Sequence, residues 1–439
     1  MLAEMRPLAG ARRLFSDPRA RSIVELHVWT MEAGLHGVTA GELFDGYCRR
    51  LVEEGMPLLR AYVSTQTLHP QWSGYGYTWH RRLNAVREQH YERVASPRSE
   101  WLRSPFFQLI ERARAGEPTP SLRRRLSLGP EQRDFPALVE FHDDGATDYY
   151  AIVYTYGLHG DPAHGTGVVF SFAVDGEHGF DESHLMLLEA TLPGLALALK
   201  AHAGHDIASS LLRTYLGEDA GRRVHSGAVV RGTTEGLQAV IWYADIRGFT
   251  RASDRWPWPA IIEMLDEAFE SLAAPLRERG GQVLKFIGDA MLAIFAVQDE
   301  KLSVVCRRAL DAAEEALALL AARNAERDAL GAPVVEVDIA LHVGEVLYGN
   351  VGAADRLDFT VIGPAVNEAA RIEKLCDGLD RRILASQRFA RAGEFCGGRL
   401  APLGTHALRG VETPQVIYGI VDDSYVVDGK RAATVSGPP

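Results

Sequence analysis

The sequence predicts an α+β protein with more than one domain. Its 439 residues exceed the usual size of one domain, and 46% of them are hydrophobic, enough to bury real cores. Long helical patterns alternate with short apolar runs that are typical of strands. Between residues 236 and 420 these elements follow the order β-α-β-β-α-β, which predicts a ferredoxin-like core with additions.

Helices are predicted near the start of the chain and again before its middle. Residues 1–20 are rich in arginine and predict a flexible arm, whereas residues 21–60 carry apolar positions at helical spacing. Asp181 predicts the N-cap of an apolar helix that follows it. This helix contains Glu189 and Pro193 and is too short to cross a bilayer, so we expect a packed helix and no membrane span.

Strands are predicted between these helices. Residues 61–70 and 165–180 each predict a strand and a turn. Residues 135–158 alternate in polarity and predict a β-rich stretch with a hairpin turn at Asp143-Asp144-Gly145. By pattern alone, residues 21–199 resemble a GAF- or PAS-type sensor domain, and the sequence does not indicate which small molecule or protein provides the signal.

Aromatic and histidine side chains in this region allow two interpretations each. The aromatic cluster either lines a pocket or packs in the core, and packing is favoured; its members are Trp72, Tyr75, Tyr77 and Trp79. The histidines either bind haem or a metal or lie at the surface, and the surface is favoured; these are His142, His164 and His178.

Residues 200–235 predict a helical linker between this region and the C-terminal domain. Four apolar residues predict a helical seam between two protomers, with an ordinary linker helix as the alternative; they are Leu199, Ile207, Leu211 and Leu212.

Charge and cysteine content restrict the classes of partner. The net charge is −11 and the pI about 5.8, which argues against nucleic acid or an anionic membrane as the main partner. The four cysteines lack metal-site spacing, and no secretory signal stands at the start of the sequence. We therefore expect a reduced, cytoplasmic protein.

Two aspartates stand at strand ends in the C-terminal domain. Asp245 ends an apolar run, and Asp289 separates two short runs. In the predicted core the central strands lie side by side, which brings both carboxylates to one edge. Such a pair suits Mg²⁺ or Mn²⁺, and two such ions can assist phosphoryl transfer. The alternative is that Asp245 is a strand-end cap and Asp289 a turn residue.

Residues 236–420 resemble the catalytic domain of class III nucleotidyl cyclases, the adenylate and guanylate cyclase family. The matching stretches occur in order and at similar spacing: ADIRGFT, GGQVLKFIGDAMLAIF, HVGEVLYGNVG, DFTVIGPAVNEAARIE and LRGVETPQVIYGI. The resemblance predicts a catalytic domain over residues 236–422, followed by a flexible tail over residues 423–439.

The resemblance implies a role for each matched residue. Asp245, Asp289 and the carbonyl of Ile246 would bind Mg²⁺ or Mn²⁺, two ions per active site. Lys285 and Thr360 would bind adenine, and Asn367 and Arg371, four residues apart on one helix, would orient ribose and stabilise the transition state. The substrate phosphates would contact two places: Arg409, and the turn after Asp245, which contains Ile246, Gly248, Phe249 and Thr250. Arg356, after a predicted turn at residues 349–352, either reaches phosphate or closes a turn.

This reading implies an adenylate cyclase that converts ATP to 3′,5′-cyclic AMP and pyrophosphate. The family resemblance also implies a homodimer, in which one protomer supplies the metal-binding aspartates and the other the remaining residues. The sensor domain would then regulate activity through the arrangement of the protomers. A guanylate cyclase and an inactive nucleotide-binding regulatory protein remain as alternatives, whereas a diguanylate cyclase would need a GG[DE]EF hairpin in place of FIGDAM.

Overall fold

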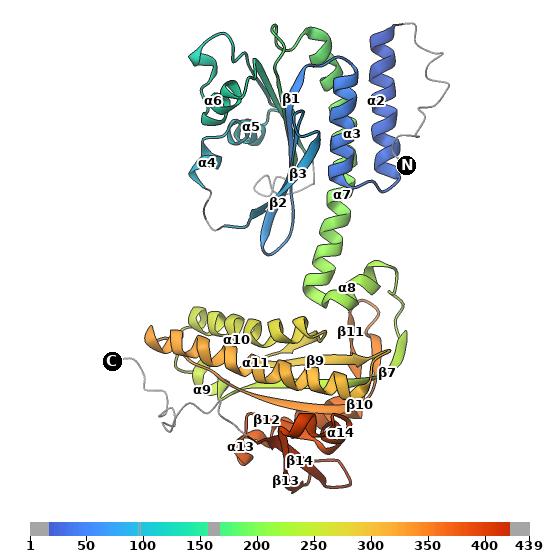
Figure 1. Ribbon diagram of the computed structural model, residues 1–439, viewed down its shortest axis with the longest axis vertical. Helices are drawn as coiled ribbons and strands as arrows, with labels where there is room; N and C mark the ends of the chain where they lie inside the picture. Colours follow the sequence, from blue (N-terminus) through green and yellow to red (C-terminus); the bar gives the residue numbers. More distant parts are fainter. Residues whose placement is uncertain (1–16, 95, 97, 157–166, 422–439) are drawn as a thin grey trace. The chain divides into compact units, whose positions relative to one another are not determined.

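A computed structural model describes residues 17–94, 96, 98–156 and 167–421 of the chain (Figure 1). The chain divides into two units, Met1–Leu211 and Leu212–Pro439. The division falls within the range predicted as a linker, 200–235. Helix α2 begins at Pro18, inside the range predicted as an arm, while most of that arm and nearly all of the predicted tail lie outside the described residues.

The N-terminal unit contains a six-stranded antiparallel sheet in the order β3-β2-β1-β6-β5-β4. The strands are β1 (Leu58–Gln66), β2 (Trp72–His80), β3 (Ala85–Glu92), β4 (Ser121–Arg124), β5 (Asp148–Thr155) and β6 (Gly167–Val174). The strands predicted within residues 61–70 and 165–180 are confirmed as β1 and β6.

Helices cover both faces of this sheet (Figure 1). One face packs against α2 (Pro18–Leu35), α3 (Ala40–Glu53) and α7 (Glu182–Leu216). The other face packs against α5 (Pro105–Arg114) and α6 (Pro136–Asp143), and α4 (Ser99–Leu102) precedes α5. The unit is therefore α+β, as predicted, and its assignment to the GAF or PAS type stays a prediction.

Residues 136–143 form helix α6, so the β-rich prediction for this part of residues 135–158 is wrong. Pro136 occupies the first helical turn, where its fixed φ angle suits a helix. Leu138 and Phe141, three residues apart, both face the core beneath the sheet. The predicted hairpin turn is instead the end of the helix, where Gly145 adopts φ 100°.

Helix α7 begins as predicted, because the backbone N–H of His184 donates to Asp181 Oδ1 at 2.8 Å. By length and composition alone α7 is the one helix among the described residues that is long and apolar enough to cross a membrane. Half of its most apolar window is buried inside the protein, which a packed core helix also shows.

The C-terminal unit contains an eight-stranded sheet whose path runs β13-β14-β12-β10-β7-β9-β8, with β11 paired to β10. Its strands are β7 (Thr234–Arg247), β8 (Gln282–Ile287), β9 (Ala290–Val297), β10 (Glu336–Gly352), β11 (Leu357–Ile362), β12 (Ile383–Ser386), β13 (Leu400–His406) and β14 (Gln415–Ile420). The neighbours β10-β7-β9-β8 all pair antiparallel, and helices α10 and α11 complete the predicted β-α-β-β-α-β core.

Two layers of helix enclose this sheet. On one face α10 (Trp258–Glu278) and α11 (Leu302–Ala329) cover the core (Figure 1), and the short α9 (Phe249–Ser253) precedes them. On the other face lie α8 (Glu218–His225) and α12 (Pro364–Glu373); α13 (Cys376–Leu379) and α14 (Gln387–Ala392) follow in the chain. Residues 239–244 of strand β7 are apolar because Trp242 faces the first layer and Ile241 the second.

The turn predicted at residues 349–352 is wrong, because these residues extend β10 and the reversal lies at residues 353–356. Gly349 and Gly352 occupy places where a neighbouring strand comes very close. A Cβ atom at Gly349 would lie 2.2 Å from the carbonyl oxygen of Thr233, so the strand pairing itself requires glycine.

A buried ion pair fixes the end of β7. Asp338 on β10 lies directly opposite Asp245 and is only 4% exposed. Its carboxylate accepts hydrogen bonds from Arg247 Nε at 2.9 Å and Nη2 at 2.8 Å, and from Arg382 Nη1 at 3.3 Å. Since Arg247 stands two residues after Asp245, this fork sets the position of the strand end that carries Asp245.

We expect Asp338→Asn to lower the free energy of unfolding by about 2 kcal/mol, because Arg247 would lose its carboxylate in a mostly buried setting. Chemical denaturation of the full chain measures this. As a control, Glu270→Gln breaks an exposed pair with Arg277 and should cost less than about 0.5 kcal/mol. Equal losses in the two variants would contradict a supporting role for Asp338.

Candidate active site

Asp245 and Asp289 are neighbours at one edge of the sheet, as the sequence predicts. Asp245 stands near the end of β7, directly opposite Ala290, the first residue of β9. Asp289 belongs to the tight turn between β8 and β9, where Gly288 adopts φ 64°. The backbone N–H of Ile246 donates to the carbonyl oxygen of Asp289 at 3.3 Å, which ties the two strand ends together.

The charge of Asp245 is disfavoured in this position. Burial, and then the nearby Asp289 carboxylate, raise the pKa of Asp245 to about 6. Asp245 Oδ1 is buried and has no hydrogen-bond partner among the described residues. A divalent cation would satisfy this oxygen and remove the repulsion, so the donor set fits Mg²⁺ or Mn²⁺.

A third carboxylate, Glu373, lies close enough to act on Asp245. It is buried near the end of α12, and burial followed by the charges of Asp245 and Asp338 raises its pKa to about 7. Within the described ranges no group of three or more His, Cys, Asp or Glu side chains is arranged to hold a metal. The fit to a cation therefore rests on the two aspartates, with Glu373 behind them.

Lys285 on β8 forms an ion pair with Asp358 on β11. Asp358 and Thr360 stand two residues apart and therefore face the same side of β11. Sequence analysis selected Lys285 and Thr360 but missed Asp358. The two-residue spacing from Thr360 is the only sequence signal for it, and the pairing with Lys285 depends on the fold.

Asn367 and Arg371 line an open cleft of about 730 Å³ at the start of α12. The other lining residues come from the loop before α12, from α12 itself, from Arg388 and from the loop before β14: Ile362, Gly363, Pro364, Glu368, Arg388, Gly410, Val411, Glu412, Thr413 and Gln415. The four-residue spacing thus places Asn367 and Arg371 on one cleft, as predicted. Arg409 is exposed and precedes the lining residue Gly410.

A buried pair beneath this cleft was missed by sequence analysis. His342 on β10 is fully buried, and its Nε2 lies 3.7 Å from Glu368 Oε2. Burial lowers the pKa of His342 to about 4, so the imidazole is neutral near pH 7. Glu368 Oε2 also accepts a hydrogen bond from Gln415 Nε2 at 3.0 Å, which joins α12 to the loop before β14.

The chain thus holds its predicted site residues in separate groups. Neither Asp245, Asp289, Lys285 nor Thr360 lines the cleft that contains Asn367 and Arg371. Gly248 adopts φ 72° and begins α9, with Phe249 as its first residue and Thr250 exposed. Arg356 lies in the exposed reversal between β10 and β11.

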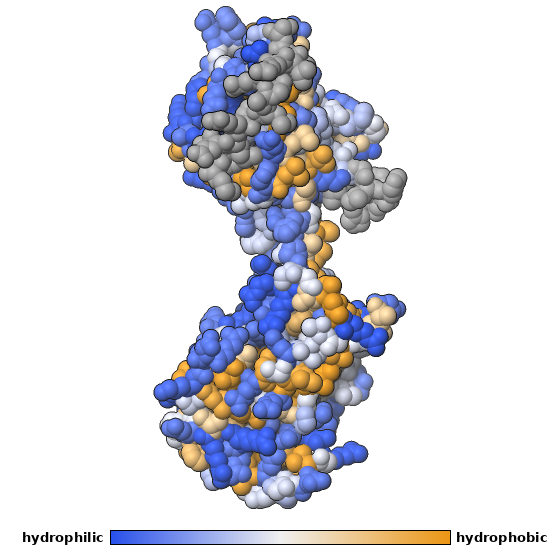
Figure 2. Space-filling model, turned by 90° about the vertical axis from the view of Figure 1, so that its right-hand side faces the viewer, coloured by the Kyte–Doolittle hydropathy of each residue, from blue (hydrophilic) through white to orange (hydrophobic). Residues whose placement is uncertain are grey.

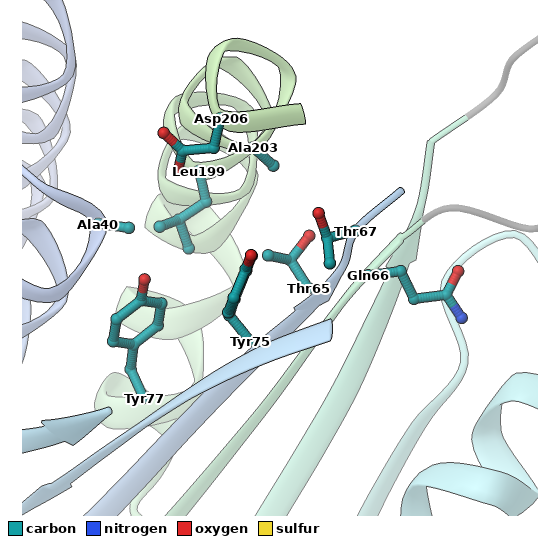
Figure 3. Close-up of a pocket in the computed structure, with 9 residues that line it drawn as sticks. All are labelled: Ala40, Thr65, Gln66, Thr67, Tyr75, Tyr77, Leu199, Ala203 and Asp206. Carbon is teal, nitrogen blue, oxygen red and sulfur yellow. The ribbon is translucent and has the colours of Figure 1, made fainter. Parts of the chain in front are cut away.

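The N-terminal unit has a small pocket between β1, β2 and α7 (Figure 3). The hydroxyl groups of Tyr75, Tyr77 and Thr67 point toward α7, where Asp206 lies above them (Figure 3). The pocket holds about 10 Å³, room for roughly one water molecule. Of the aromatic cluster, Tyr75 and Tyr77 therefore line a pocket, whereas Trp79 is buried in the core.

The histidines of this unit fit the surface interpretation that the sequence favours. His142 Nε2 lies 2.7 Å from Arg133 Nη2, and His178 is exposed. His164 lies outside the described residues. Because His142 has an arginine partner and His178 faces solvent, these two fit the surface interpretation.

Residues 234–421 match the model of the adenylate and guanylate cyclase catalytic domain family. An uncharacterized protein of Mycobacterium tuberculosis is 32% identical over 207 residues, which cover 46% of this chain and 37% of that protein. An adenylate cyclase of Anabaena cylindrica is 31% identical over 164 residues, 36% of this chain and 32% of that protein.

Solved cyclase structures are similar to the same region. The guanylyl cyclase Cya2 is 26% identical, with a TM-score of 0.38, and the match covers 46% of this chain and 97% of that one. The adenylyl cyclase CyaB from P. aeruginosa is 23% identical, with a TM-score of 0.37, over 43% of this chain and 96% of that one.

The matched region covers only about a third of the length of the curated relatives named above. It covers the whole sheet of the C-terminal unit, including the βαββαβ core and every site residue described there. Over residues 234–421, the C-terminal unit therefore matches the adenylate and guanylate cyclase catalytic domain family.

Proposed function

We propose that the C-terminal domain is an adenylate cyclase, which converts ATP to 3′,5′-cyclic AMP and pyrophosphate and is regulated by the N-terminal unit. The observation that carries the proposal is the pair Asp245 and Asp289, whose buried, unpartnered carboxylate oxygen and mutual repulsion suit a cation. In a cyclase domain, the binding of nucleotide phosphates would explain why two carboxylates are held together despite this repulsion.

The active site forms between two copies of the chain in this proposal. One copy contributes Asp245 and Asp289, and the other contributes Lys285, Thr360, Asn367 and Arg371. The aspartates do not line the cleft that contains Asn367 and Arg371, which supports placing these two pairs on different copies. Lys285 and Thr360 join the second group through the family resemblance. A two-fold symmetric pair then contains two equivalent sites.

The reaction forms a bond between the ribose 3′-oxygen and the α-phosphorus and breaks the bond from that phosphorus to the pyrophosphate oxygen. When bound, Mg²⁺ or Mn²⁺ neutralises phosphate charge and lowers the pKa of the 3′-hydroxyl, whose proton passes to solvent. The chain's own contribution is positioning: Asn367 orients the ribose, and the Arg371 guanidinium meets the charge that develops on the phosphoryl oxygens.

The base pocket favours adenine in this proposal. The Lys285 ammonium donates to a ring nitrogen of adenine, and the Thr360 hydroxyl accepts from its amino group. Asp358 supports a second candidate, guanylate cyclase, because its carboxylate can accept the N–H groups that guanine presents while Lys285 donates to the guanine carbonyl. The two candidates differ in which base the Lys285–Asp358 pair accommodates.

We expect Asp245→Asn to stabilise the metal-free protein by about 1 kcal/mol at about pH 8, a value discounted because the group is half-buried. The pKa of Asp245 is raised from 3.8 to about 6, so its charge destabilises the folded state fully above pH 6. This destabilisation decreases as the pH falls and is absent below the pKa of Asp245 in the unfolded chain. The stability advantage of Asp245→Asn should therefore vanish at about pH 4.

Thermal unfolding of both proteins across pH measures this difference. Added Mn²⁺ should raise the unfolding temperature of the unchanged protein but not of Asp245→Asn, because only the former keeps both carboxylates. An equal metal response in the two proteins would place the ion elsewhere.

Mixing tests the shared site. Asp245→Ala and Arg371→Ala should each be nearly inactive alone, because each removes one group from both sites. Co-expressed chains should regain about a quarter of the unmodified activity, since about half the dimers are mixed and each has one intact site. Cyclic AMP release under Mn²⁺ and ATP measures this, and an absence of recovery in dimers shown to be mixed would argue against sites built from two copies.

Substrate choice tests the base pocket. We expect ATP to be turned over with a higher kcat/KM than GTP, and Lys285→Ala to lower kcat/KM for ATP by about 10- to 100-fold, the loss of one charge-assisted hydrogen bond. Thr360→Val should raise KM, while Thr360→Ser, which keeps the hydroxyl, should not. A preference for GTP that disappears in Asp358→Ala would establish guanylate cyclase instead.

A further inference from the structure

The guanidinium of Arg371 has no polar partner in the part of the chain that the structure describes. It forms neither a hydrogen bond nor an ion pair there, although Glu368 and Glu412 line the same cleft. Arg382 and Arg399, by contrast, each pair with two acidic side chains. A group that stabilises a transition state must be held within about 0.5 Å of its working position. The contacts that fix Arg371 therefore determine how well it can act.

The backbone at Gly410 supplies such a contact. Gly410 stands in the loop between β13 and β14 and adopts φ 74°. A Cβ atom added to it would lie 3.4 Å from Arg371 Nη2 and 3.6 Å from Arg371 Nη1, so the loop lies against the end of the guanidinium. Because glycine has no side chain, the guanidinium can lie beside the loop backbone and still line the cleft. The position of Arg371 thus depends on the position of this loop.

Two anchors fix this loop, which spans residues 407–414. The first is apolar, because Leu408 is 3% exposed and belongs to a core cluster that includes a residue of α12. The second is polar, because Gln415 Nε2 donates to Glu368 Oε2 at 3.0 Å. Glu368 stands three residues before Arg371 on α12, so the two side chains lie on the same side of the helix. The hydrogen bond therefore ties the end of the loop to the helix that carries Arg371.

The surroundings of Glu368 favour this one hydrogen bond. His342 Nε2 lies 3.7 Å from Glu368 Oε2, too far for a hydrogen bond, and the imidazole is neutral near pH 7. It therefore does not compete with Gln415, which is the one hydrogen-bond donor that the described residues offer to Glu368. The Glu368 side chain is only 15% exposed, so little water is present to replace Gln415.

The cleft differs in character from the apolar surface of the same unit. Figure 2 shows hydrophobic residues, in orange, among hydrophilic ones on one face of the C-terminal unit. Exposed apolar patches suit protein partners. More than half of the residues that line the cleft are polar or charged, which suits a charged small ligand instead. The orientation of such a ligand depends on precisely placed polar groups.

We propose that Gln415 and Glu368 are positioning residues for Arg371. Their hydrogen bond keeps the loop against the Arg371 guanidinium, which stays directed at the phosphoryl oxygens without a carboxylate of its own. A direct acidic partner would hold the arginine in place but would also neutralise the charge that the transition state needs. The loop fixes the side chain and leaves its charge available. This inference rests on the proposed function, which supplies the role of Arg371.

Steady-state kinetics of the full chain test the pair, with whichever of ATP and GTP the protein turns over. Gln415→Leu keeps most of the side-chain volume but donates no hydrogen bond. We expect it to lower kcat about 10- to 100-fold with KM changed less than about threefold, because Arg371 meets charge that develops only in the transition state. Glu368→Gln keeps an acceptor oxygen and should retain kcat within about threefold.

Gln298→Leu is the matched control, since it makes the same substitution at an exposed residue just after β9 and should change neither constant. Chemical denaturation checks that each variant is folded. If Gln415→Leu does not fold, Gln415→Asn takes its place with the same expectation, because its amide is one methylene too short to reach Glu368.

A double variant separates positioning from a general structural role. Arg371→Ala removes the group that the loop supports, so the addition of Gln415→Leu should lower the small residual rate less than about threefold. A merely structural hydrogen bond would lower the rate by the same factor in both backgrounds. Cyclic nucleotide accumulated over long incubations with Mn²⁺ measures the residual rate.

Three outcomes would overturn the positioning role. One is a folded Gln415 variant with unchanged kcat. Another is an equal loss of activity when Gln415→Leu is added to the unmodified protein and to Arg371→Ala. The third is a loss in Glu368→Gln as large as that in Gln415→Leu, which assigns the effect to the charge of Glu368. In each case the unmodified protein is active, so the proposed function stands. An unmodified protein that makes neither cyclic AMP nor cyclic GMP would reject the proposed function, and this inference with it.

Discussion

The repulsion between Asp245 and Asp289 is the constraint on which the C-terminal domain depends. Antiparallel pairing of β7 with β9 brings the two carboxylates together, and burial denies them full solvation. Either aspartate alone would be an ordinary strand-end residue. Together they make a place where an acid holds its proton well above its usual pKa unless a cation replaces that proton, and the charge of Asp245 in turn raises the pKa of Glu373 on α12.

The fold can tolerate this strain because the strands beneath it are strongly fixed. β7 is covered on both faces, with Trp242 and Ala244 against α10 and α11 and Ile241 against the α12 side. The fork from Arg247 to Asp338 closes the same strand end with two hydrogen bonds. Apolar burial therefore determines where the strand lies, and the ion pair determines where it ends, so the carboxylates cannot relax apart without loss of both.

The parts of this arrangement that depend on local pattern could be predicted from the sequence. Apolar runs and helical spacing were enough for the βαββαβ order, and that order was enough to place Asp245 beside Asp289. Asn367 and Arg371 were selected through the family resemblance, and their four-residue spacing was enough to place them on one face of a helix. Residues 136–143 could not be assigned correctly, because the polarity pattern of a short helix beside a strand resembles the alternation that is typical of a strand. Only the contact of Leu138 with the sheet distinguishes the two.

Residues that depend on tertiary register could not be predicted in this way. Asp358 meets Lys285 because β11 folds back on β10, and the distance in sequence, 73 positions, carries no sign of it. Glu373 and His342 act through burial and through neighbours on other elements, which no local window contains. The helical seam predicted between two protomers is wrong at Leu199 for a different reason, because this residue is 3% exposed and packs in the core of its own unit.

The start of the C-terminal unit explains how changes in its linker can reach the base pocket. Gly217, just before α8, is packed so closely on β8 that a Cβ atom would lie 3.1 Å from the Val283 carbonyl oxygen, two residues before Lys285. Asp219 accepts a hydrogen bond from Tyr348 on β10, and Tyr348 is paired with Val361, next to Thr360. Helix α8 is thus attached to the strands that carry Lys285 and Thr360, so a displacement of the linker would act through direct contacts on the residues that are proposed to bind the base.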